Sequence, residues 1–319
     1  MADVVATKPM WRKIVDFPLV AMLIALAIML ALSFVTGRIG PYVQSAVPAP
    51  YDLLVGAFIV IGLGYAAYKL VIRHLGEIKR DDLRSEHALR DLGLGVGGSF
   101  LLMSAIVGVA ALFDVYNIIG EGGFDGFVYI LAGGGLIAGF MEELVFRGIL
   151  FRWIEEFLGS WAALAITALL FGFAHQMNDN ATTFSSIAIA VEAGLLLGAA
   201  YMLTRSLWLA IGIHFGWNVT QGFVFDVPVS GHDVEGLVTA KMSGPELLSG
   251  GAFGLEASLI ALVLATAAGL WLLMKAVRKG EVMQPWWVRR RRARALASDE
   301  TVGVDVDRDA NASGPLDPA

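Results

Sequence analysis

Two adjacent glutamates, Glu142 and Glu143, stand in an apolar stretch that ends at Arg147. Glu143 and Arg147 are four residues apart, so on a helix they share a face and can form an ion pair. Glu142 points about 100° away and stays free for other chemistry. A carboxylate in a low-dielectric site is a good proton acceptor, which makes Glu142 a candidate general base. The pair also fits a helix end that is simply interfacial.

Two histidines in later apolar stretches each have a partner four residues away. Phe171 precedes His175, and Asn218 follows His214, so each pair shares a helix face. Imidazole and amide groups can orient a water molecule or donate hydrogen bonds to an oxyanion. Each pair alone also fits a packing role or a contact that holds helices together. Glu192 has no partner in sequence and is interpreted as structural.

Taken together, these residues supply what a hydrolytic site needs: a base, orienting groups and donors for the developing oxyanion. The composition indicates whether such a site lies in a soluble domain or in a membrane. The chain of 319 residues is 57% hydrophobic and only 16% charged, and its mean hydropathy is +0.68. A soluble domain has about 25% charged residues, so a membrane protein is predicted. The absence of cysteine excludes disulfides, zinc-thiolate sites and a cysteine nucleophile.

Eight apolar segments approach the length of about 20 residues that crosses a hydrocarbon core of roughly 30 Å. The predicted fold class is all-α, a polytopic membrane protein of about eight transmembrane helices. The spans centre on 17–36, 53–72, 92–113, 127–146, 161–175, 183–203, 207–225 and 253–274. These bounds place Glu142 and His214 in one half of the membrane and His175 nearer the other surface. The three depths agree only if the fifth helix begins later or tilts.

Lysines and arginines gather beside alternate span ends, and acidic residues occupy the opposite loops. With eight spans all basic clusters fall on one side, and the positive-inside rule then predicts a multi-pass protein of the cell membrane with both termini cytoplasmic. Residues 1–126 hold the first three helices and a charged connector at 73–90, and 127–225 hold the candidate site. Residues 226–296 form an outer loop, the last helix and a basic anchor, and 297–319 are predicted to be disordered.

The motifs EExxxR, FxxxH and HxxxN, in this order on successive membrane helices, resemble the CPBP family. This family includes the type II CAAX prenyl endopeptidases and bacteriocin-processing or bacteriocin-immunity proteins, among them relatives like lysostaphin resistance protein A. The resemblance covers about residues 127–225, and the glycine-rich segment at 250–256 is also similar to bacterial members. The matching positions are Glu142, Glu143, Arg147, Phe171, His175, His214 and Asn218.

The resemblance implies an intramembrane endopeptidase that cleaves a membrane-associated or prenylated, CAAX-like substrate. Glu142 would activate the water, His175 would help position it, and His214 and Asn218 would stabilise the oxyanion. No cofactor is expected, although Glu142, His175 and His214 also suit zinc, so a zinc-dependent protease stays open. A non-catalytic binding or bacteriocin-immunity protein of the same fold is the other alternative.

The expected partners are membrane lipids and a hydrophobic or lipidated peptide, and the expected state is a monomer. Trp286 and Trp287 beside the arginines at 289–292 are typical of an interfacial anchor on anionic lipid. Nucleic acid is therefore not expected as a partner.

Overall fold

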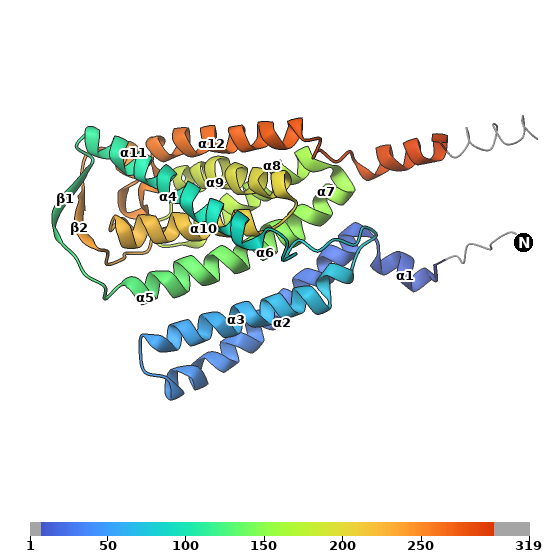
Figure 1. The fold of residues 1–319 in the computed structure, drawn as a ribbon, viewed down its shortest axis with the longest axis horizontal. Coiled ribbons are helices and arrows are strands. Elements are labelled where there is room, and N and C mark those ends of the chain that lie inside the picture. The colour runs from blue at the N-terminus through green and yellow to red at the C-terminus, as the bar shows by residue number, and fades with distance from the viewer. Residues whose placement is uncertain (1–7, 297–319) are drawn as a thin grey trace, which may run out of the picture.

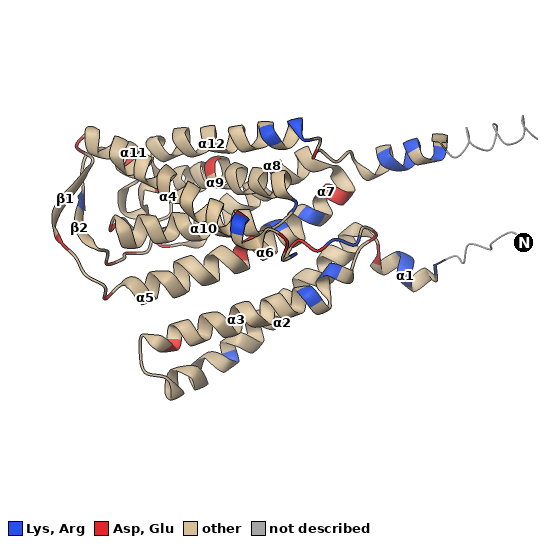
Figure 2. Ribbon diagram, viewed as in Figure 1, with Lys and Arg blue, Asp and Glu red and all other residues tan. Residues whose placement is uncertain are grey.

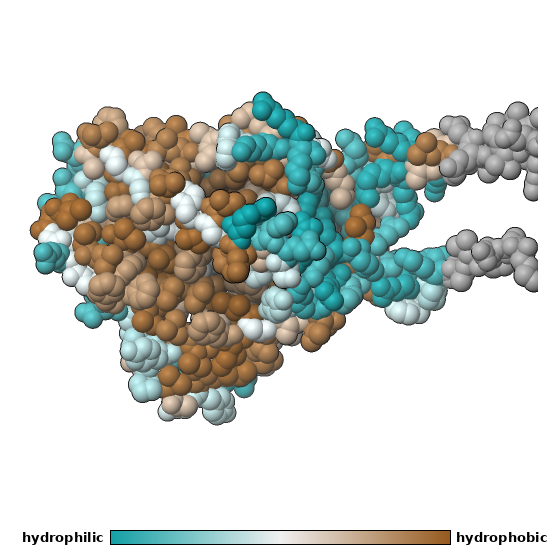
Figure 3. Space-filling model, in the orientation of Figure 1, coloured by the Kyte–Doolittle hydropathy of each residue, from teal (hydrophilic) through white to brown (hydrophobic). Residues whose placement is uncertain are grey.

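The structure, a computed structural model, describes residues 8–296. The tail at 297–319, which we predicted to be disordered, lies outside the described residues. Within them, long helices lie side by side, and a two-stranded sheet covers one end of the bundle (Figure 1). Hydrophobic residues cover much of the face of the bundle that Figure 3 shows, as a surface in contact with lipid requires. The predicted all-α, polytopic membrane fold is confirmed.

Seven helices in residues 8–296 are long and apolar enough to cross a membrane. The longest is continuous from Phe127 to Leu158 and is called the long fourth helix. It comprises α5 (Phe127–Tyr129), η2 (Ile130–Glu142), α6 (Glu143–Val145), η3 (Phe146–Phe151) and α7 (Arg152–Leu158), of which η2 and η3 are π-helical. The other spans contain α2 (Pro18–Ala46), α3 (Tyr51–Leu70), α4 (Ala88–Leu112), α8 (Ser160–Ala174), α9 (Thr183–Thr204) and α12 (Leu259–Arg278).

The eighth predicted span, 207–225, is helical but shorter than the others. It forms α10 (Trp208–Val219), which continues as the π-helix η5 (Thr220–Val224). α10 packs against α4, α9 and the long fourth helix, and most of its residues are buried. A helix enclosed by protein does not need apolar side chains along the full thickness of the membrane, which explains why only seven helices meet the length criterion.

Three predicted span ends were wrong. The first helix continues to Ala46 instead of ending near residue 36. The long fourth helix continues past residue 146, because Arg147 and Arg152 are buried and paired instead of marking a membrane surface. The last helix starts at Leu259, because the hydroxyl of Ser258 accepts the Ala261 N–H at 3.1 Å and caps it there.

The sheet at one end of the bundle was not predicted. Strands β1 (Tyr116–Glu121) and β2 (Val238–Met242) pair antiparallel, with an irregularity near Gly120. Their segments are separated by more than a hundred residues, and neither is long enough to be recognised from a pattern of alternating residues. Shorter helices complete the described chain: α1 (Met10–Val15), α11 (Glu246–Ser249), and the 3-10 turns η1 (Ile72–His74), η4 (His175–Met177), η6 (Gly251–Phe253) and η7 (Leu255–Ala257).

Basic side chains gather at the other end, near α1, α7 and the helical residues 286–296 (Figure 2). We call this the basic end. The connector at 73–90 folds into it around Asp82, which is fully buried. Tyr68 and Tyr201 donate hydroxyl hydrogen bonds to Asp82 at 2.8 and 3.1 Å. Arg80 and Arg152 lie 2.7 and 3.4 Å from its carboxylate. The basic end is therefore closed by a buried ionic network that links the connector to three helices: α3, the long fourth helix and α9.

Candidate active site

The long fourth helix places Glu142 and Glu143 near its midpoint. Glu143 is fully buried, and its Oε1 lies 2.8 Å from Nη1 of Arg147, which is also fully buried. The Arg147 guanidinium stacks 4.6 Å from the centre of the Phe171 ring, which gives the cation a second favourable contact. The ion pair that the spacing suggested is therefore present, with α8 covering it.

His214 on α10 contacts the same glutamate. Its Nδ1 lies 2.9 Å from Glu143 Oε1. Because a carboxylate oxygen accepts the hydrogen bond, Nδ1 carries the proton and Nε2 points elsewhere. The close approach of α10 depends on Gly139, where a Cβ atom would lie only 3.1 Å from the backbone nitrogen of Phe215. Glu143 thus orients His214 and is itself held by Arg147.

Glu142 has a different environment. Its side chain is 35% exposed, and its Oε2 is shielded from solvent without a hydrogen-bond partner among the described residues. His214 Nε2 lies 4.0 Å from that oxygen, which is too long for a direct hydrogen bond. No protein group occupies this oxygen, and the exposed part of the Glu142 side chain is open to a ligand or a water molecule.

His175 and Asn218 complete the group. His175 Nδ1 donates to the Phe171 carbonyl at 2.8 Å, since a carbonyl only accepts, and this leaves Nε2 free. The Asn218 amide donates to the Gly134 carbonyl at 2.8 Å and retains one more N–H. Each side chain is thus fixed by one backbone contact and presents a second polar atom for other partners.

Glu142, His175, His214 and Asn218 line one cavity of about 1010 Å³. One wall of the cavity follows the long fourth helix at intervals of four residues, which keeps the wall on one helix face. Small residues make this wall recede and leave room for a ligand chain. The wall positions on the helix are Ile130, Gly134, Ala138 and Glu142, and Gly126 lines the cavity just before the helix begins.

The cavity extends from Glu142 toward the end of the bundle that carries the sheet. Asp125, Asp233 and Glu235 line its outer part, and its lining contains no lysine or arginine among the described residues. The lining therefore has an acidic character, in contrast to the basic end. The predicted site residues meet here as follows: four face the cavity, and Glu143 and Arg147 support them from behind.

The extra length of the fourth helix removes the conflict between the predicted depths. Glu142 lies about 24 Å from the basic end of that helix, at 1.5 Å per residue. Gly159, with φ +87°, turns the chain directly into α8, and His175 lies about 22 Å along the return path. The two side chains therefore reach the same level in the bundle.

Comparison with family models matches residues 123–220 to the type II CAAX prenyl endopeptidases, described as Rce1-like. This match supports the assignment of the segment to the CPBP family. The matched segment includes the long fourth helix, α8, α9 and α10, and all seven motif positions fall within it. Searches of curated proteins and of solved structures found no match to the chain.

Among the described residues, the side chains of the candidate site that also suit zinc do not form a ready ligand cluster. Zinc ligands lie about 2.0–2.2 Å from the metal, so their donor atoms must approach one another closely. In residues 8–296 no group of three or more histidine and carboxylate side chains is arranged to hold a metal. Glu142 and His214 are 4.0 Å apart at their nearest polar atoms, and Nδ1 of both histidines is engaged by protein acceptors.

Glu256 supports the candidate site but was not among the site residues predicted from sequence. Glu256 accepts hydrogen bonds from the Ser230 hydroxyl at 2.8 Å and from Gln221 at 2.5 Å. Ser230 lines the large cavity, so Glu256 holds a cavity loop in place. The signal was the glycine-rich segment before Glu256: Gly254 has φ +119° and passes against the backbone of residue 228, where a side chain would not fit.

Proposed function

We propose that the protein is an intramembrane endopeptidase that hydrolyses a peptide bond in a hydrophobic, membrane-associated substrate by means of water activated by Glu142. The Rce1-like match supports a CAAX-type intramembrane protease at the family level. The observation that carries the mechanism is Glu142 itself, a carboxylate with an unpartnered oxygen at the inner end of a cavity of about 1010 Å³. A cavity of this size accommodates an extended peptide segment.

In the proposed reaction, Glu142 holds a water molecule against the substrate carbonyl, and the His175 ring beside it confines that water at the site. Glu142 takes a proton as the water oxygen bonds to the carbonyl carbon, and a tetrahedral oxyanion forms. The free amide N–H of Asn218 donates to that oxyanion, and His214 adds a second donor at Nε2 when that nitrogen also carries a proton. Glu142 then passes its proton to the amide nitrogen as the carbon–nitrogen bond breaks, which releases an amine and a carboxylic acid.

The remaining residues predicted from sequence have supporting roles in this mechanism. Glu143 and Arg147 hold His214 in register with Glu142, so they position catalytic groups without touching the substrate. Membrane lipids surround the bundle, and the substrate is a hydrophobic or lipidated peptide that one copy of the chain cleaves. The reaction needs no metal or organic cofactor.

The decisive experiment is cleavage by purified protein in lipid nanodiscs, with a farnesylated CAAX peptide and an unmodified peptide library. Glu142→Gln keeps the shape and hydrogen bonding of the side chain but removes proton acceptance, so turnover should be abolished with an unchanged melting temperature. Glu246→Gln, at an exposed carboxylate on α11, is the matched control and should cleave like wild type. Cleavage by neither wild type nor the control would instead favour a non-catalytic binding protein of this fold.

A further inference from the structure

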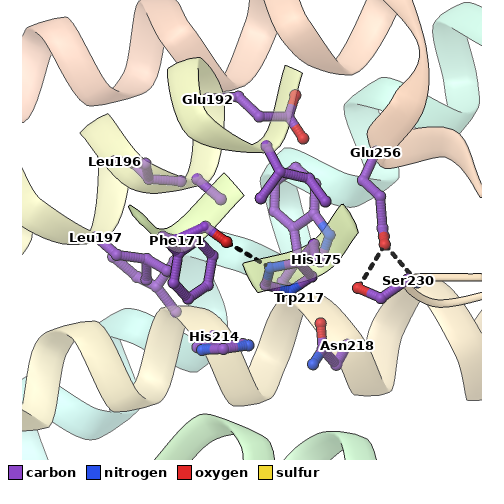
Figure 4. Close-up of a pocket in the computed structure, with 13 residues that line it drawn as sticks. Phe171, His175, Glu192, Leu196, Leu197, His214, Trp217, Asn218, Ser230 and Glu256 are labelled. Atoms are coloured by element: carbon purple, nitrogen blue, oxygen red, sulfur yellow. Dashed lines mark hydrogen bonds between the residues drawn. The ribbon is translucent and has the colours of Figure 1, made fainter. Parts of the chain in front are cut away.

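A second, smaller cavity of about 40 Å³ lies behind the active site. We call it the inner chamber. It shares four lining residues with the large cavity, and these form the partition between the two spaces. Figure 4 shows Glu192 and Glu256 on one side of the chamber, with His214 and Asn218 on the other side. The partition consists of His175, His214, Asn218 and Ser230.

Glu192, on α9, is the feature of the chamber that the proposed mechanism does not use. The residue is fully buried, and neither carboxyl oxygen has a hydrogen-bond partner among the described residues. An ionised carboxylate in that position would be very costly, so the side chain is held as a neutral carboxylic acid, which can both donate and accept. Buried polar groups find a partner in protein or in ordered water, and here the protein supplies none.

The chamber is large enough for ordered water, and a few polar side chains interrupt its otherwise apolar lining. One water molecule needs about 10–15 Å³ of such space and two to four polar partners, so the chamber accommodates two or three molecules. Glu192, Ser230, Asn218 and His175 offer polar atoms around it. Glu256 is already engaged by Ser230 and Gln221, which leaves Glu192 as the carboxyl that depends on this water.

His175 is the group that such water can reach from the active-site side. Its Nδ1 proton is committed to the Phe171 carbonyl at 2.8 Å, so Nε2 offers a lone pair. The imidazole lines both cavities. A chamber water that accepts a hydrogen bond from Glu192 can therefore donate one to the ring and restrict its rotation.

We propose that Glu192 is a positioning residue of the hydrolytic site and that water held in the inner chamber links its carboxyl group to the His175 ring. The role assigned to His175 in hydrolysis rests on the proposed function, whereas the water link itself does not. Glutamine closely mimics a neutral glutamic acid at position 192, because its amide group can also both donate and accept hydrogen bonds. Leucine fills a similar volume but leaves the chamber water without its partner.

The link is tested first by spectroscopy, which needs no turnover. Full-length protein with ¹⁵N-labelled histidine is placed in nanodiscs, and His175→Gln assigns the ring signals. Glu192→Leu should shift the ring nitrogen signals of His175, and Glu192→Gln should leave them near their wild-type positions. Thr167→Val removes another buried hydroxyl, one that donates to the Ala163 carbonyl and lines neither cavity, and should not move them.

Infrared difference spectra of wild type and Glu192→Gln test the neutral form. They should show a carboxylic acid band that shifts when the solvent is changed to D₂O, as contact with exchangeable water requires. If this band is absent, or if the His175 signals are the same in Glu192→Leu and wild type, the proposal is overturned.

Kinetics then measure the effect on hydrolysis. Glu192→Leu should lower kcat by about tenfold or more with little change in KM, because it affects orientation and not substrate binding. Glu192→Gln should restore most of kcat. A Gln variant as slow as the Leu variant would contradict a neutral acid at this position. If wild type cleaves no peptide while the spectra behave as expected, the endopeptidase proposal fails and the water link stands.

Discussion

The two adjacent glutamates differ in what surrounds each carboxylate. Glu143 is fully buried and accepts hydrogen bonds from both Arg147 and His214. Glu142 retains an oxygen without a partner and faces the cavity. Because a general base needs a free lone pair next to its water, the different environments support two different roles for identical side chains.

Removal of the supporting cation should affect stability more than chemistry. Arg147→Ala leaves the Glu143 carboxylate buried without its partner, which should cost about 3–5 kcal/mol. Thermal unfolding in detergent measures the loss, with Arg278→Ala at the exposed end of α12 as the control. An Arg147→Ala protein that melts like wild type would show that the pair is not needed for folding.

The proposed mechanism also makes a prediction about metal. If Glu142 alone activates the water, dialysis against a strong chelator should leave nearly all cleavage activity. Elemental analysis of the same preparation supplies the control. One tightly bound zinc per chain, with activity lost on its removal and restored on its return, would replace this mechanism by a zinc-dependent one with His175 and His214 as ligands.

The site depends on how closely two helices approach each other. His214 reaches Glu143 because α10 packs against the long fourth helix at Gly139. Gly139 lies in η2, which is π-helical from Ile130 to Glu142. π-helical segments often occur at functional sites. The geometry of these backbones thus decides whether the base and its orienting histidine meet.

A larger side chain at position 139 should move α10 away from the long fourth helix. In Gly139→Val, the Cβ atom would lie 3.1 Å from the Phe215 backbone nitrogen and force α10 away. A shift of about 1 Å at the site can cost roughly 10²-fold in rate, so kcat should fall on that scale. Gly98→Val on α4, where a Cβ meets nothing within 4 Å, should keep wild-type turnover. Equal activity of both variants would argue against this contact as the determinant.

The whole molecule has two chemically different ends. The basic end is closed by the buried network around Asp82. At the other end the cavity is lined by Asp125, Asp233 and Glu235. If the positive-inside rule holds for this chain, the basic end is cytoplasmic and substrate enters the cavity from the opposite side of the membrane.

Cysteine labelling can test this orientation on a clean background, because the chain has no native cysteine. Thr239→Cys lies in β2 at the cavity end, and Ala293→Cys lies in the helical residues 286–296 at the basic end. In intact cells a membrane-impermeant thiol reagent should modify Thr239→Cys only, and lysis should make Ala293→Cys reactive. Labelling of both before lysis would refute this topology, and the reverse pattern would place the cavity in the cytoplasm.

The class of fold and the residues of the candidate site could be predicted from the sequence alone. Both depend on local physics: apolar length decides what a membrane accepts, and spacing of four decides which side chains share a helix face. The pairs Glu143–Arg147 and His214–Asn218 lie within one helix each, so their spacing could be interpreted without a structure. The order of the three motifs added the resemblance to the CPBP family.

The sequence could not show which polar residues mark a membrane surface and which are buried, because this depends on contacts between distant segments. Arg147 and Arg152 look like the end of a span in sequence, yet partners that include the distant Asp82 neutralise them and let the helix continue. The inner chamber beside Glu192 likewise depends on Glu256, which lies 64 positions further along the chain. Pairing between distant segments sets the cost of burying a charge, and no local pattern encodes it.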